Sequence, residues 1–291
     1  MSRRRKREPA ARRSRAPEQG AGAGRRSRAP EQGVEQGPGA GVEKGGESVV
    51  LNVVVNGFWG VRDEGPQVIA ERWYATLARL GELDGGTFHG WHEAGDGVPA
   101  DPLLMPSVPA LADYVVRENT GPDLEVVGYG ASLWAHNSGA PKVTSAIRVG
   151  GSSPYLTNSV LVTFRSRTVG EDADVIRRTP EILAAIGEAW DIDGGQVYDR
   201  ALYRAVADHF GLKNSDPRCG RAVFLSERRA ALAPEGLPGA YTPAAHGGLI
   251  IDLTYGGTQT PSAETVIDVN TQLRATGALE PLATPFDRAK L

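Results

Sequence analysis

The pattern of apolar and polar residues begins with a buried strand and an amphipathic helix. Residues 49–55 (VVLNVVV) are an almost unbroken apolar run, which is typical of a strand buried on both faces. After Pro66, which suits the first position of a helix, apolar residues recur from Ile69 at spacings of four, four and three. The pattern therefore predicts a helix over 66–83.

The middle of the chain changes to a period of two, which predicts strands. Over 127–134 apolar residues alternate with small or polar ones, and similar segments follow at 142–149 and 158–164. Asn-Ser-Gly and Gly-Gly-Ser turns separate the three segments. We expect an antiparallel meander.

Helical patterns return in the second half of the chain. Thr179 has the side chain of an N-cap, and Pro180 after it suits the first helical position, which predicts a helix ending near Trp190. Spacings of four predict a helix over 199–210, and Ser262 predicts the start of a final helix.

The remaining segments complete an α+β pattern. Residues 221–226 and 248–255 are predicted strands separated by a Pro/Gly-rich loop, a short helix is expected over 109–119, and 84–108 is a long connection. Strands and helices come in runs and not in strict alternation. We expect one α+β domain over 49–291, with an antiparallel-rich sheet flanked by helices.

Residues 1–48 differ from the rest of the chain. They consist almost entirely of Arg, Ala, Gly, Pro, Glu and Gln, lack aromatic residues, and contain the sequence RRSRAPEQG twice. Such a segment cannot bury enough apolar surface to offset the entropy of ordering, so it is predicted to be disordered. The alternatives are an unconstrained extension and a basic arm that contacts nucleic acid or membrane.

Charge is unevenly distributed along the chain. Residues 1–48 hold 12 basic and 6 acidic side chains, giving +6, whereas 49–291 hold 20 and 29, giving −9. An acidic domain repels nucleic acid and anionic membranes but is attracted to a basic surface on another protein. The single cysteine, Cys219, suits a reducing compartment, and no apolar run approaches a membrane span, so we expect a cytoplasmic protein.

The sequence contains few candidates for catalysis. His89 and His92 could share a metal, but a closed site needs about four ligands. Gly128-Tyr-Gly-Ala-Ser132 lacks the last glycine of a nucleophile elbow, and no phosphate-binding glycine loop occurs. We predict no catalytic, cofactor-binding or metal-binding residues. A hydrolase or transferase whose site is assembled from distant residues remains the alternative.

Tryptophans and acidic loops suggest a protein-binding surface instead. Trp59 follows the first strand and Trp91 lies in the long connection, each close to carboxylates. Tryptophan is enriched at the centres of protein interfaces, although it also fills cores. The predicted contact residues are Trp59, Asp63, Glu64, Trp91, Glu93, Asp96 and Asp101. The alternative is a solvated acidic surface with the interface elsewhere.

Several blocks resemble a known family. NGFWGVRDEGPQVIAERWYATLARL resembles the opening of immunity protein family 52, which occurs in bacterial polymorphic-toxin systems. GYGASLWAHNSG with NSVLVTF, then RAVFLS, then HGGLIIDLTYGG follow in the family's order, so the resemblance covers roughly residues 50 to 283. RAVFLS departs from the pattern, because Ala222-Val223-Phe224 and Ser226 replace a Gly-Trp and a Thr-Tyr pair.

The resemblance implies a non-enzymatic α+β protein that binds and neutralises a cognate toxin. For this family the expected toxin carries a restriction-endonuclease-like nuclease domain. The family pattern supplies no set of toxin-contacting residues, so the predicted contact residues depend on the charge and tryptophan pattern alone.

Overall fold

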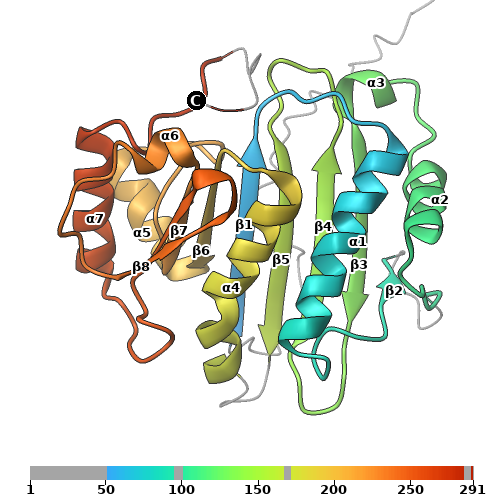
Figure 1. Cartoon of the computed structure of the whole chain (residues 1–291), viewed down its shortest axis with the longest axis horizontal. Coiled ribbons are helices and arrows are strands. Elements are labelled where there is room, and N and C mark those ends of the chain that lie inside the picture. Colours follow the sequence, from blue (N-terminus) through green and yellow to red (C-terminus); the bar gives the residue numbers. More distant parts are fainter. Residues whose placement is uncertain (1–50, 95–100, 167–171, 285–289, 291) are drawn as a thin grey trace, which may run out of the picture. The chain divides into compact units, whose positions relative to one another are not determined.

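The computed structural model describes residues 51–94, 101–166, 172–284 and 290, all within one compact unit. These residues form a single α+β domain around a nine-stranded antiparallel sheet, which confirms the predicted fold class (Figure 1). The predicted tail, 1–48, lies outside the described residues. No helix among the described residues combines the length and the apolar character that crossing a membrane requires.

The sheet has the strand order β2-β3-β4-β5-β1-β6-β7-β9-β8, with every neighbouring pair antiparallel. The strands are β1 (Leu51–Trp59), β2 (His92–Glu93), β3 (Tyr129–Ala135), β4 (Lys142–Val149), β5 (Asn158–Ser166), β6 (Gly194–Asp199), β7 (Ala222–Leu225), β8 (Ala240–Pro243) and β9 (Leu249–Asp252). The predicted meander is present as β3, β4 and β5.

Seven α-helices and one 3₁₀ turn accompany the sheet in the described part of the chain. They are α1 (Pro66–Leu83), α2 (Val108–Glu118), α3 (Leu124–Val127), α4 (Asp172–Trp190), α5 (Arg200–Phe210), α6 (Glu227–Ala230), α7 (Ala263–Ala275) and η1 (Ala245–Gly247). The predicted helix over 66–83 is confirmed to the residue.

Two hydrophobic cores use opposite faces of the sheet. On one face lie α1, α2 and α4 (Figure 1). They bury large side chains such as Trp73, Tyr114 and Trp190 against β1, β3, β4 and β5. On the other face α5 and α7 pack against alternate residues of β7 and β9, including Val223 and Ile251. Because residues alternate between faces along a strand, β7 and β9 contribute to both cores.

The strand β6 is absent from the sequence prediction because it begins with two glycines. A Cβ atom on Gly194 would lie 2.7 Å from Cζ of Phe58, and one on Gly195 would lie 2.8 Å from Cδ1 of Leu183. Side chains from β1 and α4 therefore occupy the space that side chains of β6 would fill. The pattern of a strand is missing where its neighbours supply the packing.

The predicted start of α4 is wrong. The helix begins at Asp172 and runs through Thr179 and Pro180, so these residues do not form its N-terminus. Proline inside a helix removes one backbone hydrogen bond and clashes with the preceding turn. Thr179 is fully buried, and Ile182 and Ile186 pack in the first core, so tertiary contacts outweigh the local preference.

Both edges of the sheet are protected from pairing with another strand. At one edge the two-residue strand β2 pairs only with Leu133 and Trp134 of β3. Farther along β3, the side chain of Asn119 accepts from the backbone N–H of Gly130 and donates to its carbonyl, both at 2.9 Å, and the hydroxyl of Tyr114 donates to the carbonyl of Ser132. At the other edge, β8 has four residues and ends at Pro243, which has no N–H. Short strands, proline and covering side chains are common protections of sheet edges.

Candidate interaction surface

The two predicted tryptophan anchors lie inside the protein. Trp59 is 0 % exposed and stacks on Trp190 with ring centroids 5.6 Å apart, and Trp91 is 3 % exposed within the first core. Neither side chain offers surface to a partner. The alternative interpretation, that these tryptophans fill the core, describes their positions.

The predicted carboxylates differ in their availability. Glu64 is buried beside Arg72 and Arg62, at 2.9 and 3.8 Å, Glu93 is paired with Arg117 at 2.6 Å, and Asp101 accepts from the indole N–H of Trp134. Asp63 is exposed and forms no ion pair with a described residue. Asp96 lies outside the described residues.

The structure does not bring the two predicted loops together. The β1–α1 connection, with Asp63 and Glu64, precedes the first turn of α1, whereas Glu93 lies in β2, toward the other end of that helix (Figure 1). The surface around Asp63 must therefore be built with other neighbours.

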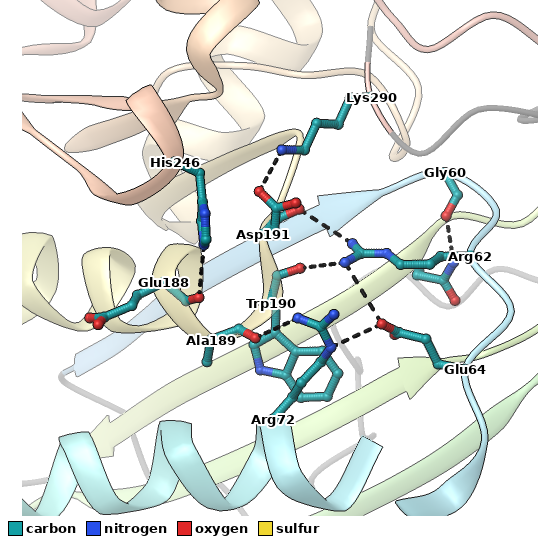
Figure 2. A network of polar contacts seen from close by, with 11 residues as sticks. Gly60, Arg62, Glu64, Arg72, Glu188, Ala189, Trp190, Asp191, His246 and Lys290 are labelled. Atoms are coloured by element: carbon teal, nitrogen blue, oxygen red, sulfur yellow. Dashed lines mark hydrogen bonds and ion pairs between the residues drawn. The ribbon is translucent and has the colours of Figure 1, made fainter. Parts of the chain in front are cut away.

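One set of neighbours is the C-terminal end of α4. The last carbonyls of a helix lack partners within it, and cations are favoured there. Arg62 donates to the carbonyls of Trp190 and Asp191, at 2.8 and 3.3 Å, and Arg72 donates to that of Ala189 at 2.8 Å. Figure 2 shows these bonds converging on the end of the helix from the β1–α1 connection and from α1.

The same helix end carries further polar contacts. His246 lies 3.2 Å from the carbonyl of Glu188 and donates through Nε2, since a carbonyl only accepts (Figure 2). Asp191 adopts a left-handed φ of 47° and bonds to Lys290. Burial raises the pKa of Asp191, but the hydrogen bond and charge of Lys290, together with the charges of His246 and Arg62, lower it below its ordinary value. All these contacts stabilise the end of α4.

This network fixes the β1–α1 connection. Arg62 and Glu64 both turn inward, toward Trp190 and toward Arg72 (Figure 2). Asp63 between them is exposed. Arg62 also lies over the Trp59 ring, 4.7 Å from its centroid. The residues on both sides of Asp63, Arg62 and Glu64, are thus fixed by contacts with α4 and α1, which holds the exposed carboxylate of Asp63 in place.

The β4–β5 connection packs against both this connection and α3. The β4–β5 connection donates from the backbone N–H groups of Ser152 and Ser153 to the carbonyls of Glu125 and Val126 in α3, each at 3.0 Å. A Cβ atom on Gly150, which has φ of 79°, would lie 2.6 Å from the carbonyl oxygen of Glu64. The β1–α1 connection, α3 and the β4–β5 connection therefore meet at one end of the central strands (Figure 1).

Close backbone packing at this end of the strands requires glycine. Gly128 has φ of 81°, and a Cβ atom there would lie 2.4 Å from the backbone nitrogen of Gly151. A Cβ atom on Gly151 would lie 2.7 Å from the carbonyl carbon of Val127. Only glycine permits both the left-handed conformation and the close approach.

Exposed apolar and acidic side chains gather on the three segments. Tyr155 is 66 % exposed, and Val126 and Val127 are 51 % and 45 % exposed. Three exposed carboxylates accompany them, none in an ion pair with a described residue. We call this set the junction surface; it comprises Asp63, Asp123, Glu125, Val126, Val127 and Tyr155.

The described residues contain little that points to another kind of site. No group of three or more His, Cys, Asp or Glu among them is placed to hold a metal ion. Cys219 is fully buried, and burial raises the pKa of its thiol far above the ordinary value. Because the thiolate is the reactive form, Cys219 is poorly suited to nucleophilic chemistry.

Sequence reasoning found one member of the junction surface, Asp63. Val127 was hidden because the apolar pattern there predicts the beginning of a strand, whereas the chain forms a single helical turn before β3. The Gly150-Gly151 pair is a visible turn signal, but which segments meet there is decided by the sheet order.

No protein-family model and no curated protein sequence matches the chain. The resemblance to immunity protein family 52 therefore rests on the sequence blocks alone. Among solved structures, the chain is similar to the Pseudomonas aeruginosa T6SS protein PA0821, with 9 % identity, a TM-score of 0.44, and coverage of 81 % of this chain and 74 % of that one. A likeness this distant does not bear on function.

Proposed function

We propose that this chain is an immunity-type inhibitor that binds a toxin protein through the junction surface. The observation that carries the proposal is the combination of exposed Tyr155, Val126 and Val127 with three carboxylates that no described cation neutralises. Apolar side chains gathered within a polar rim are typical of protein interaction sites.

Electrostatics supports a basic partner. Residues 49–291 carry a net charge of −9. Asp63, Asp123 and Glu125 place negative charge around the exposed apolar residues of the junction surface. A nuclease presents a basic cleft to its nucleic acid, and an acidic inhibitor is steered to such a cleft by long-range attraction. A restriction-endonuclease-like nuclease, which the sequence resemblance implies, fits this chemistry.

Rigidity of the surface favours tight binding. The three segments are joined by backbone hydrogen bonds and glycine contacts, and Arg62 and Arg72 hold the β1–α1 connection against α4. A surface that is ordered before binding loses less conformational entropy on association. Inhibition then needs no ligand, cofactor or covalent step from this chain.

The test uses the protein encoded beside this chain as the candidate toxin. Wild-type protein is expected to rescue cells that express the toxin and to bind it in titration calorimetry. Tyr155→Ala is expected to weaken binding at least about tenfold, as loss of an interface anchor does. Combined reversal at Asp123→Lys and Glu125→Lys should slow association and remove most of its salt dependence.

Matched controls lie far from the junction surface along the chain. Tyr241→Ala removes a tyrosine of comparable type that is 42 % exposed on β8, and Asp208→Lys reverses an exposed charge on α5. Both variants should bind as the wild type does. Toxin binding that is equally strong in the junction and control variants would place the interface elsewhere, whereas a wild type that neither binds nor rescues would refute the function.

A further inference from the structure

A second surface has the opposite charge. The adjacent strands β3, β4, β5 and β1 contain Lys142, Arg148 and Arg165 but no Asp or Glu, although the body as a whole is acidic. Lys142 pairs directly with Arg165 across β4 and β5, and Arg148 shares their face because residues two apart along a strand point the same way.

All three cations lie on the face that the first core does not use. Their neighbours Val143, Ile147 and Phe164 point to the opposite side and are buried under the helices. The described helices α5 and α7 cover this other face only behind β6, β7 and β9, where they form the second core. We call the part of this face outside the second core the basic sheet face; it is defined by Ser132, Trp134, Lys142, Thr144, Arg148, Leu161, Thr163 and Arg165. Lys142 and Arg165 are exposed there, and the other six residues are half-buried.

The pair formed by Lys142 and Arg165 is unfavourable for the isolated domain. Like charges directly opposite one another in an antiparallel pair repel. Both side chains are exposed, and neither forms an ion pair with a described carboxylate. An external anion that binds between them would remove the repulsion.

We propose that the basic sheet face binds an acidic segment of a partner protein. Carboxylates of the segment neutralise Lys142 and Arg165, while Thr144, Thr163 and Ser132 present hydroxyls beside them along the same face. This proposal does not depend on the junction surface, because Lys142 begins β4 whereas the β4–β5 connection follows its other end.

The aromatic residue on this face favours a protein over a single-stranded nucleic acid. Sequence-tolerant binding of single strands uses aromatic rings on which bases stack. The ring of Trp134 already stacks on the ring of His92, with centroids 4.6 Å apart. The ammonium nitrogen of Lys142 also lies over the Trp134 ring, 4.5 Å from its centroid. Phe58 in β1 and Tyr198 in β6, which lie on the same side of the sheet, are buried, and the exposed Tyr241 lies on β8, at the opposite edge of the sheet.

The experiment follows backbone amide signals by NMR in the full chain, with hexaglutamate peptide as the probe. Signals of β4 and β5 near Lys142 and Arg165 should shift on titration. The double variant Lys142→Glu, Arg165→Glu should lower the affinity at these signals about tenfold, since two attractive charges become repulsive. The control variant Arg204→Glu, a reversal at an exposed position on α5, should leave them unchanged.

A second titration uses an oligothymidylate as the probe. Shifts on β4 and β5 that are stronger with oligothymidylate than with hexaglutamate would overturn the assignment to an acidic protein segment in favour of nucleic acid. Shifts confined to residues 1–48, or the absence of shifts on both strands, would overturn the site. Loss of folding in the double variant is checked by its thermal unfolding, and the single variant Arg165→Gln then provides the comparison.

Discussion

At the scale of single residues, one ion pair is wholly enclosed by the protein. The carboxylate of Asp193, just before β6, accepts from Nη2 and Nε of Arg229 in α6 at 2.6 and 2.9 Å, and both side chains are 0 % exposed. Arg229 also donates to the carbonyls of Ala278 and Glu280 after α7. This guanidinium therefore joins the sheet to the C-terminal segment.

Replacing Arg229 should be strongly destabilising. In Arg229→Met the carboxylate of Asp193 stays buried and loses its cation, which lowers the free energy of unfolding by about 3–5 kcal/mol. Urea denaturation followed by circular dichroism measures the change. The control is Arg79→Ala, which removes the exposed pair with Glu82 and should leave stability unchanged. Equal effects of the two variants would contradict the assigned importance of the buried pair.

At the scale of elements, glycines in two helices differ in how closely other parts of the protein approach them. A Cβ atom on Gly187 in α4 would lie 2.6 Å from Cε2 of Phe224 in β7, so the helix approaches the sheet too closely for a methyl group. A Cβ atom on Gly81 in α1 would reach only ordinary contact, 3.9 Å from the carbonyl oxygen of Phe88. The same substitution should thus act in opposite directions.

Thermal and urea unfolding of two variants test this difference. Gly81→Ala should raise the free energy of unfolding by about 0.5–1 kcal/mol, because alanine restricts the unfolded chain and fits the helix. Gly187→Ala should lower it by about 1–3 kcal/mol through overpacking against Phe224. A stabilising effect of Gly187→Ala would show that α4 can move away from β7 at little cost.

At the scale of the whole domain, two cores share one sheet. Cys219 lies in the second core, whereas Trp59, Trp73, Trp91 and Trp190 lie in the first. Because β7 and β9 contribute alternate residues to both cores, neither core can lose its packing without disturbing strands of the other. We expect one cooperative unfolding transition.

Two probes in one urea titration measure this cooperativity. Labelling of the Cys219 thiol reports exposure of the second core, and tryptophan fluorescence mainly reports the first core, which contains four of the five tryptophans. The two curves should coincide, with no labelling of the native protein, since the thiol is buried and its pKa is raised. Thiol exposure at a lower urea concentration than the fluorescence change would mean that the second core unfolds separately.

The elements with a regular pattern were predictable from the sequence. α1 shows uninterrupted apolar spacing with Pro66 at its start. In β3, β4 and β5, inward-pointing and outward-pointing residues alternate, and glycine-containing turns separate the three strands. Elements whose packing is completed by other segments were not predictable. Gly194 and Gly195 hide β6, and Pro180 falsely marks the start of α4.

The candidate surfaces were only partly predictable for the same reason. Trp59 and Asp63 are close in the sequence and were therefore predicted to share one surface. Trp59 ends a strand and points into the core, whereas Asp63 lies in the connection after it and is exposed. Tyr155 reaches the junction surface because the β4–β5 connection meets α3, which no local pattern records.

The sequence by itself determined the α+β class, the acidic body behind a basic first 48 residues, and the most regular helices and strands, since these depend on composition and on spacing along the chain. Only the tertiary structure decided the strand order, the burial of the tryptophans, and the gathering of the junction surface and the basic sheet face. The physical reason is that both surfaces are made by side chains distant along the chain, and the pairing of strands sets which of them meet.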